Sequence, residues 1–141
     1  MRNLLINIGK KSRKASSYQL DTKKKDEVLK DYLLLIEKNK KLILNENKKD
    51  INNANKKKIK ESLLKRLILN DKKISEIINS IKKIIKLKDP TNIILEKWKR
   101  PSGLNISKIS IPIGTIGVIY ESRPNVTSDV ASLCFKSGNP V

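Results

Sequence analysis

The stretch IPIGTIGVIYESRPNVTSDVASLCFKSGNPV, residues 111–141, differs in composition from the rest of the chain and indicates the fold class. It begins with the apolar run GTIGVIY, which lacks polar alternation and is typical of a strand buried on both faces in a parallel sheet. A polar loop follows this run, and helical spacing follows the loop. The order of strand, loop and helix predicts an α/β fold with the start of a Rossmann-like unit.

The helix after this loop is predicted over about residues 128–137. Thr127 or Ser128 can cap its N-terminus, and Asp129 in the first turn would suit the positive helix end. Gly138 lies where helices commonly end with a positive φ. Since a second parallel strand would complete the unit and the sequence stops before one, we expect a truncated first part of a longer domain.

Residues 1–90 are predicted to be helical, because their apolar side chains recur at helical spacing. Three stripes are expected to face a core, with a weaker one from Ile43 to Ala54. The stripes are Leu4, Leu5, Ile8, Ala15 and Tyr18 in a helix over residues 3–20; Val28, Leu29, Tyr32, Leu33 and Ile36 after a cap at Asp21 or Thr22; and Ile74, Ile77, Ile78, Ile81, Ile84 and Ile85 after a cap at Asn70 or Asp71.

Residues 91–111 change to the alternation of extended chain and predict a β-hairpin around the turn Pro101-Ser102-Gly103. The alternation slips at Ser107-Lys108, which predicts a β-bulge there. Because exposed hairpin edges invite strand pairing, we expect this hairpin to protrude toward a partner subunit.

The chain is strongly basic, with 32 Lys and Arg against 14 Asp and Glu and a formal net charge of +18. Such charge favours contact with polyanions, yet base and phosphate recognition often uses the arginine fork, and no aromatic side chains interleave with the lysines. The only arginines are Arg2, Arg13, Arg66, Arg100 and Arg123. We therefore expect weak, salt-sensitive adsorption and no specific nucleic-acid partner.

Cys134 is the single cysteine and histidine is absent, so neither an internal disulfide nor a Cys/His metal site is expected. No apolar run is long enough for a bilayer, and the first residues lack the pattern of a signal peptide. These features predict a protein of the reducing cytoplasm, without a membrane partner.

The loop between the predicted strand and helix gathers Glu121, Arg123 and Asn125. In open α/β sheets, ligands bind at the carboxyl ends of strands, so these side chains lie in a suitable place. Pro124 would restrict the loop's geometry. A solvated loop with an Arg–Glu pair remains an equal alternative on the residues alone.

The segment GVIYESRPNVTSDVASLCFKSGN resembles the signature of gamma-glutamyl phosphate reductase (glutamate-5-semialdehyde dehydrogenase), a branch of the aldehyde dehydrogenase superfamily. The resemblance extends over the chain as the family's N-terminal portion. It is carried upstream by Leu44-Asn45-Glu46-Asn47 with Asp50, Arg66-Leu67 with Leu69, Leu87-Lys88-Asp89-Pro90, Ser102-Gly103-Leu104 and Ile111-Pro112-Ile113-Gly114.

This resemblance implies that residues 1–141 are the N-terminal part of an NADP-binding domain, with an oligomerisation-type hairpin at 91–111, a strand–loop–helix at 112–141, and no catalytic domain. It implies NADPH-dependent reduction of L-glutamyl 5-phosphate to L-glutamate 5-semialdehyde and phosphate in proline biosynthesis. Glutamate 5-kinase is implied as a possible upstream partner, and a homo-oligomer as the intact form.

The resemblance also assigns residues to the site. Asn125 is the counterpart of an oxyanion donor. Substrate or cofactor contacts fall to Tyr120, Glu121, Ser122, Arg123 and Pro124. The family's nucleophilic cysteine lies in a separate domain downstream, so Cys134 is predicted to be structural and the chain inactive alone.

Two positions depart from the family pattern. Lys65 stands where an Asp is usual, and Pro140 stands where a small residue usually enters the next strand, although proline cannot donate to a central ladder. The alternative to the enzyme assignment is a non-catalytic remnant or subunit-pairing module of the same family, and a basic nucleic-acid-binding protein is a weaker one.

Overall fold

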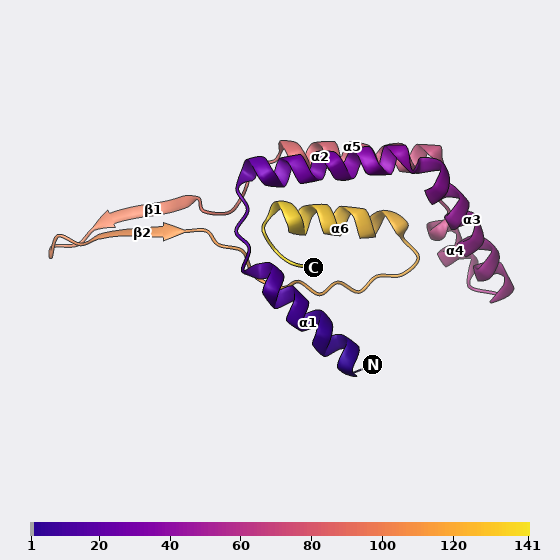
Figure 1. Cartoon of the computed structure of the whole chain (residues 1–141), viewed down its shortest axis with the longest axis horizontal. Coiled ribbons are helices and arrows are strands. Elements are labelled where there is room, and N and C mark those ends of the chain that lie inside the picture. The colour runs from indigo at the N-terminus through magenta and orange to yellow at the C-terminus, as the bar shows by residue number, and fades with distance from the viewer. Residues whose placement is uncertain (1) are drawn as a thin grey trace.

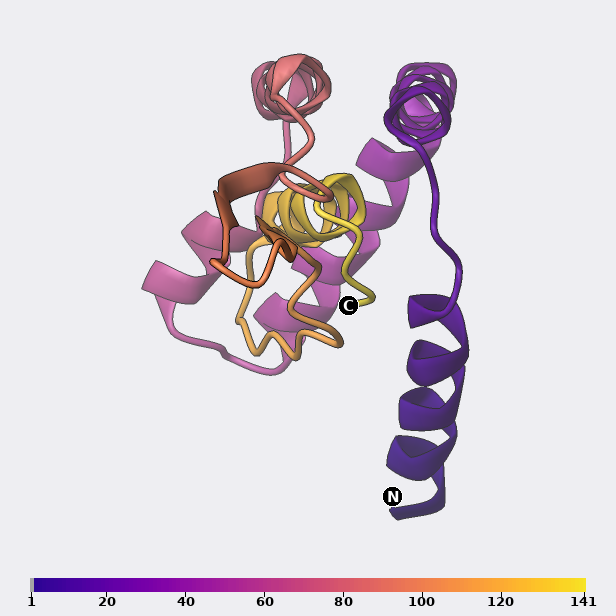
Figure 2. The ribbon, with the colours of Figure 1, turned by 90° about the vertical axis from the view of Figure 1, so that its left-hand side faces the viewer.

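The computed structural model describes residues 2–141, whose body is built from helices. The elements in chain order are α1 (Arg2–Ser16), α2 (Thr22–Lys38), α3 (Lys40–Lys56), α4 (Glu61–Leu67), α5 (Asp71–Lys86), β1 (Ile94–Lys99), β2 (Asn105–Ile109) and α6 (Pro124–Lys136). Helices α2, α5 and α6 pack on one another, with α3 and α4 at one end, while the hairpin projects from the other end (Figures 1 and 2).

The isoleucine stripe of α5 forms the centre of the core, as the sequence predicts. Ile74, Ile77, Ile78, Ile81 and Ile84 are buried, and Ile85 packs against them at the margin. Leu33 and Ile36 of α2 complete the cluster. Each such side chain contributes about 1.5–3 kcal/mol through burial, so this stripe fixes how α2 lies on α5.

Side chains at the predicted positions cap the two long helices. Asp21 Oδ1 accepts a hydrogen bond from the backbone N–H of Lys24 at 2.7 Å, and Asn70 Oδ1 accepts one from Lys73 at 2.9 Å. Each bond satisfies an amide that the first helical turn leaves free. Asp21 and Asn70, rather than Thr22 and Asp71, are therefore the N-cap residues of α2 and α5.

A buried polar cluster joins α2 to the chain that enters the hairpin. The Nζ of Lys25 donates to Asp89 Oδ2 at 2.8 Å and to Thr91 Oγ1 at 3.1 Å. Thr22 and Thr91 donate further bonds to the Asp89 carboxylate. Gly138 lies beside this cluster and has φ +72°, which confirms the predicted positive φ. A side chain at this position would also be crowded, because a Cβ would lie 3.1 Å from Pro112 Cγ.

The N-terminal helix is correctly predicted but is shorter and less buried than expected. Helix α1 ends at Ser16, and its apolar side chains face solvent, with Leu4 62% and Leu5 63% exposed. The two ribbon views show α1 extending away from the other helices (Figures 1 and 2). A stripe at helical spacing predicts a helix, but it does not say which surface covers the stripe.

The predicted strand over GTIGVIY is wrong for residues 2–141, since this segment carries no strand. Ile119 is fully exposed, whereas the prediction required burial on both faces. The physical reason is that a central strand needs hydrogen-bonded neighbours. Within residues 2–141, the hydrogen bonds that the segment's backbone makes to other parts of the chain run to the residues after α6, from Ile116 N to Pro140 O and from Gly114 N to Asn139 Oδ1, both 2.9 Å.

The hairpin forms around the predicted turn, but its bulge lies on the other strand. Strands β1 and β2 are antiparallel, with Trp98 opposite Ile106, and the register shifts between Ile94 and Glu96. The extra residue is thus in β1, opposite Lys108 and Ile109. A phase slip in sequence reports only the relative register of two strands, so it cannot assign the bulge to one of them.

None of the helices within residues 2–141 combines the length and apolarity needed to cross a bilayer.

The Asp89 carboxylate makes stability depend on acidity. Burial alone would raise its pKa, but the hydrogen bonds from Lys25, Thr91 and Thr22 outweigh burial and lower the pKa to about 2. An unfolded Asp titrates near pH ~3.9. The stabilisation is therefore complete above that pH and lost below it, and we expect urea unfolding to show a loss of roughly 2 kcal/mol between about pH 4 and pH 1.

Asp89→Asn should remove this acid dependence and also destabilise the protein near neutrality by roughly 3–5 kcal/mol, because Lys25 would remain buried without its partner. Thr22→Ala is the milder variant, and it should raise the pH at the midpoint of acid unfolding because it removes one hydrogen bond that lowers the pKa of Asp89. Asp31→Asn, on the exposed face of α2, is the matched control. An Asp89→Asn protein with the acid profile of the parent would contradict this account.

Candidate functional site

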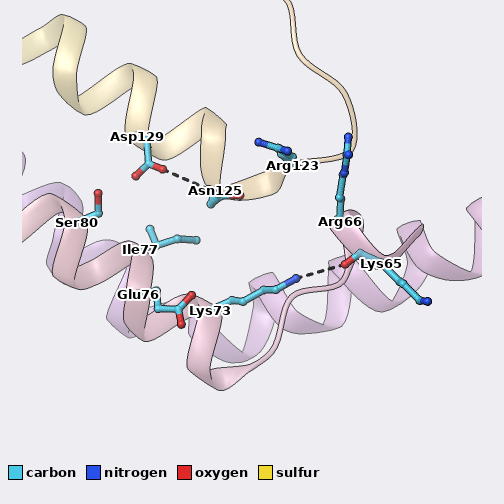
Figure 3. Close-up of a pocket in the computed structure, with 9 residues that line it drawn as sticks. All are labelled: Lys65, Arg66, Lys73, Glu76, Ile77, Ser80, Arg123, Asn125 and Asp129. Atoms are coloured by element: carbon cyan, nitrogen blue, oxygen red, sulfur yellow. Dashed lines mark hydrogen bonds between the residues drawn. The ribbon is translucent and has the colours of Figure 1, made fainter. Parts of the chain in front are cut away.

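A cleft of about 440 Å³ lies between α4, α5 and the start of α6 (Figure 3). Its lining is mainly charged or polar. The lining residues are Lys65 and Arg66 of α4; Lys73, Glu76, Ile77 and Ser80 of α5; and Arg123, Asn125 and Asp129 at α6. Three segments far apart in sequence thus supply both cations and carboxylates to one concave surface.

The loop before α6 turns sharply into the helix. Ser122 has φ +46°, a conformation that side chains other than glycine rarely adopt, and Pro124 occupies the first helical turn with its φ already restricted. Arg123 is the N-cap residue, and its side chain makes no capping bond. The predicted start at Thr127 or Ser128 is therefore wrong, because the proline at the first position begins the helix earlier.

Two arginines lie on the same side of the cleft. The close-up shows Arg66 on α4 and Arg123 at the start of α6, and both line the cleft (Figure 3). Neither is in an ion pair with a carboxylate among residues 2–141. Their planar forks remain available for a phosphate or a carboxylate, which they can bind in bidentate fashion.

The buried side chain of Asn47 holds the backbone next to Arg66 in place. Asn47 Nδ2 donates to the carbonyl of Leu67 at 2.9 Å, and Asn47 Oδ1 accepts from the N–H of Leu69 at 2.8 Å. Lys73 in turn donates from Nζ to the carbonyl of Ile68. These bonds anchor the end of α4, so Arg66 projects from a fixed backbone.

The acidic part of the cleft is on α5 and α6. Asn125 Nδ2 donates to Asp129 Oδ2 at 3.3 Å, one helical turn along α6. Asp129 Oδ1 is buried and has no hydrogen-bond partner within residues 2–141. Glu76 lines the cleft from α5. Asp129 lies in the second turn of α6 rather than the predicted first, because the helix begins at Pro124.

The structure divides the predicted site residues into two groups. Arg123 and Asn125 line the cleft, whereas Tyr120, Glu121, Ser122 and Pro124 do not. The hydroxyl of Tyr120 shares a hydrogen bond with Thr127 Oγ1 at 2.6 Å, and Glu121 faces solvent. The Arg–Glu pair of the alternative interpretation does not form within this loop, since no ion pair joins Glu121 and Arg123.

Sequence reasoning missed Arg66, Glu76 and Asp129 as site residues. Arg66 was part of a family pattern, but nothing local connected it with a loop far downstream. Cys134, by contrast, lies where a structural thiol is expected, buried in α6 with a pKa raised by that burial.

Two curated proteins of similar sequence share the name gamma-glutamyl phosphate reductase. The chain is 48% identical over 132 residues to gamma-glutamyl phosphate reductase of a Nitratiruptor species, covering 92% of the chain and 32% of the relative. It is 38% identical over 139 residues to the protein of the same name from Clostridium tetani, covering 97% of the chain and 32% of the relative. No family model matches the chain.

Solved structures agree with these relatives. The crystal structure of gamma-glutamyl phosphate reductase from Thermotoga maritima superposes with a TM-score of 0.91 at 41% identity, covering 96% of this chain and 33% of that one. The corresponding protein of Saccharomyces cerevisiae gives a TM-score of 0.89 at 30% identity, covering 94% and 34%. The chain spans about a third of the length of the curated relatives it matches.

The environment of Cys134 predicts slow reaction with alkylating agents. Because the thiol is 7% exposed and its pKa is raised, iodoacetamide should modify it at least about tenfold more slowly than a free cysteine at pH 7, with full reactivity restored in urea. Mass spectrometry of timed samples measures this rate. A Leu133→Cys, Cys134→Ala double variant, which moves the thiol to an exposed neighbouring position, is the matched control. Equal rates in the two proteins would contradict the assignment of Cys134 as an inert thiol.

Proposed function

The chain is a homologue of the N-terminal third of gamma-glutamyl phosphate reductases, and we propose that it supplies the oxyanion and substrate-binding part of an enzyme that reduces L-glutamyl 5-phosphate. One observation carries this proposal: Asn125 opens onto a cleft that it shares with the unpaired guanidinium groups of Arg66 and Arg123. An acyl phosphate needs a hydrogen-bond donor at its carbonyl and cations at its phosphate.

The reaction class assigns roles to the chain's own residues. A cysteine that this chain does not contain attacks the acyl carbon, phosphate leaves, and a thioester forms. The carbonyl oxygen becomes an oxyanion in that step, and the Asn125 amide is placed to donate to it. Arg123 binds the phosphate as it departs. Cys134 takes no part, because it is buried and its pKa is raised.

NADPH is the proposed cofactor, and when bound it would supply the hydride that reduces the thioester to the aldehyde. The residues described do not build its site by themselves, since the loop Tyr120–Arg123 has no glycine to admit a pyrophosphate and the segment before it has no paired strand. We propose that a Rossmann-like parallel sheet completes the site. Supporting this, Ile116 N donates a backbone hydrogen bond to Pro140 O, which brings the segment after α6 beside residue 116.

The remaining assignments follow from the same family. Proline biosynthesis is the proposed pathway, glutamate 5-kinase the proposed source of the substrate, and the cytoplasm the proposed location, on the basis of the single reduced cysteine. Tyr120 and Glu121 are proposed to contact cofactor or substrate only in the completed enzyme, because they lie outside the cleft.

A second function, subunit pairing, is favoured by the hairpin. It projects from the helical body (Figure 1), and Ile94, Leu95 and Trp98 are between 43% and 56% exposed. A two-stranded hairpin with exposed apolar side chains and free edges is suited to strand addition. We propose that it forms the contact through which the intact protein becomes a homo-oligomer.

Asn125 is tested in a chimaera that joins residues 1–141 to the remaining two-thirds of the Nitratiruptor reductase. The chimaera should reduce glutamyl phosphate with NADPH, and residues 1–141 alone should not. Asn125→Ala should lower kcat by about a hundred- to a thousandfold through loss of the oxyanion donor. NADPH consumption in steady-state assays measures the rate.

Asn53→Ala, on the exposed face of α3, is the control and should retain full activity, as should Cys134→Ala if folded. The oxyanion role fails if Asn125→Ala keeps kcat within a factor of three of the parent chimaera. Turnover by residues 1–141 alone would contradict the proposal that the nucleophilic cysteine lies outside this segment.

The hairpin is tested by replacing Trp98. Trp98→Lys should weaken self-association of the chimaera by at least about tenfold, because it places a charge within an apolar contact, and sedimentation velocity over a concentration series measures this. Tyr18→Lys, which alters an exposed aromatic outside the hairpin, should leave association unchanged. The pairing role is wrong if both variants associate like the parent.

A further inference from the structure

We propose that Asp129 is a positioning residue for the reaction, because its carboxylate holds the side-chain amide of Asn125 in the orientation that an oxyanion donor needs. This inference rests on the proposed function and extends it from the donor to the group that orients the donor. Asn125 Nδ2 donates to Asp129 Oδ2 at 3.3 Å, and the close-up shows this bond between two residues that line the cleft (Figure 3). The role assigned to Asp129 is to act through Asn125, without contacting the reacting atoms.

The backbone around Asn125 is held by its neighbours, which leaves the amide as the part that can rotate. Pro124, with its restricted φ, precedes Asn125 in the first turn of α6. Tyr120 and Thr127, on either side of Asn125 in the chain, share a hydrogen bond of 2.6 Å between their hydroxyl groups. Asn125 itself is exposed, and the terminal torsion of an asparagine side chain has only broad preferences. A donor aimed at one point therefore needs a partner that fixes its amide.

A carboxylate is suited to this task because, when ionised, it can only accept hydrogen bonds. If the Asn125 amide turned over, its carbonyl oxygen would face the Asp129 carboxylate in place of its nitrogen, and two acceptors repel each other. The amide nitrogen carries two hydrogens, so one can stay bonded to Asp129 while the other is available to an oxyanion. The carboxylate thus selects one of the two amide orientations in advance of the reaction.

The Asp129 side chain is committed to this contact. Within residues 2–141, its Oδ1 is buried without a hydrogen-bond partner, while its Oδ2 accepts the bond from Asn125. No ion pair engages the carboxylate in the same part of the chain. A buried oxygen without a donor costs stability, so packing alone does not account for a carboxylate at this position. Its contact with Asn125 does.

The negative charge of Asp129 gives the inference a sign that separates it from simple electrostatics. A carboxylate near a developing oxyanion repels it, so the charge effect alone predicts a faster reaction when Asp129 is neutralised. The orientation effect predicts a slower one, because a neutral amide at this position can donate as well as accept and no longer excludes the turned-over form of Asn125. The nearly isosteric change Asp129→Asn therefore distinguishes the two effects by the direction of the rate change.

The kinetic test uses the chimaera described above. Asp129→Asn should lower kcat roughly tenfold or more and leave KM within about threefold, because the oxyanion exists only as the reaction proceeds. NADPH consumption in steady-state assays measures both constants. Asp129→Glu keeps a group that only accepts hydrogen bonds and should recover part of the loss. Asp31→Asn makes the same charge change on the exposed face of α2 and should behave like the parent.

A double-mutant cycle tests whether Asp129 acts through Asn125. Asn125→Ala removes the amide that Asp129 orients, so adding Asp129→Asn to that variant should change kcat by less than about twofold. Effects that multiply would show that Asp129 acts independently, and they would overturn the inference.

The inference is also wrong if Asp129→Asn matches or exceeds the parent's kcat while Asn125→Ala is slow. That outcome discards the role of Asp129 and keeps the proposed function. If Asn125→Ala retains the parent's kcat, the oxyanion role and this inference both fail.

A measurement that needs no turnover decides the question even if a variant does not fold. Relaxation of ¹⁵N in the labelled 141-residue chain gives an order parameter for the side-chain amide of Asn125. It should be clearly higher than that of Asn53, which is exposed on α3, and Asp129→Asn should lower it to the Asn53 value. An Asn125 amide as mobile as that of Asn53 in the parent chain would overturn the inference whatever the kinetics.

Discussion

The buried ion pair between Lys25 and Asp89 connects parts of the chain that are distant in sequence. Lys25 belongs to α2, Asp89 follows α5, and Thr91 begins the path into the hairpin. Gly138, just after α6, lies close to the same ammonium, because a Cβ placed on this glycine would be 3.6 Å from Lys25 Nζ. Two desolvated charges are stabilising only when their remaining hydrogen bonds are satisfied, and the two threonines provide them. The packing of α2 on α5 and α6 depends on this arrangement.

The parts of the fold that depend on nearby residues could be predicted from sequence. The α5 stripe, the caps Asp21 and Asn70, and the turn of the hairpin each follow from residues within a few positions. The strand at 116–120 could not, because a strand exists only with its neighbours and the described residues supply one backbone bond. The prediction that the apolar face of α1 is buried failed for the same reason, because burial requires a second surface that covers the first.

Only part of the candidate site could be predicted from the sequence. Arg123 and Asn125 lie in one motif, and a family signature marks them. Arg66 lies on α4 and is brought to them by the packing of α5 on α6, which no local pattern encodes. The sequence predicts Asp129 in the first turn of the helix, whereas the helix begins at Pro124 and thereby places Asn125 one turn before Asp129. The mixed charge of the cleft is therefore a property of the tertiary structure.

Because the apolar segment around Ile116–Tyr120 is uncovered, the charge of the lysine-rich surface helps to keep the chain from aggregating. An apolar, extended stretch with unpaired backbone groups is a template for intermolecular β-aggregation, and Ile119 is fully exposed. A formal net charge of +18 opposes the close approach of two copies through electrostatic repulsion. Because salt screens that repulsion within about 8 Å at physiological ionic strength, the solubility of this chain is tied to the ionic medium rather than to its fold alone.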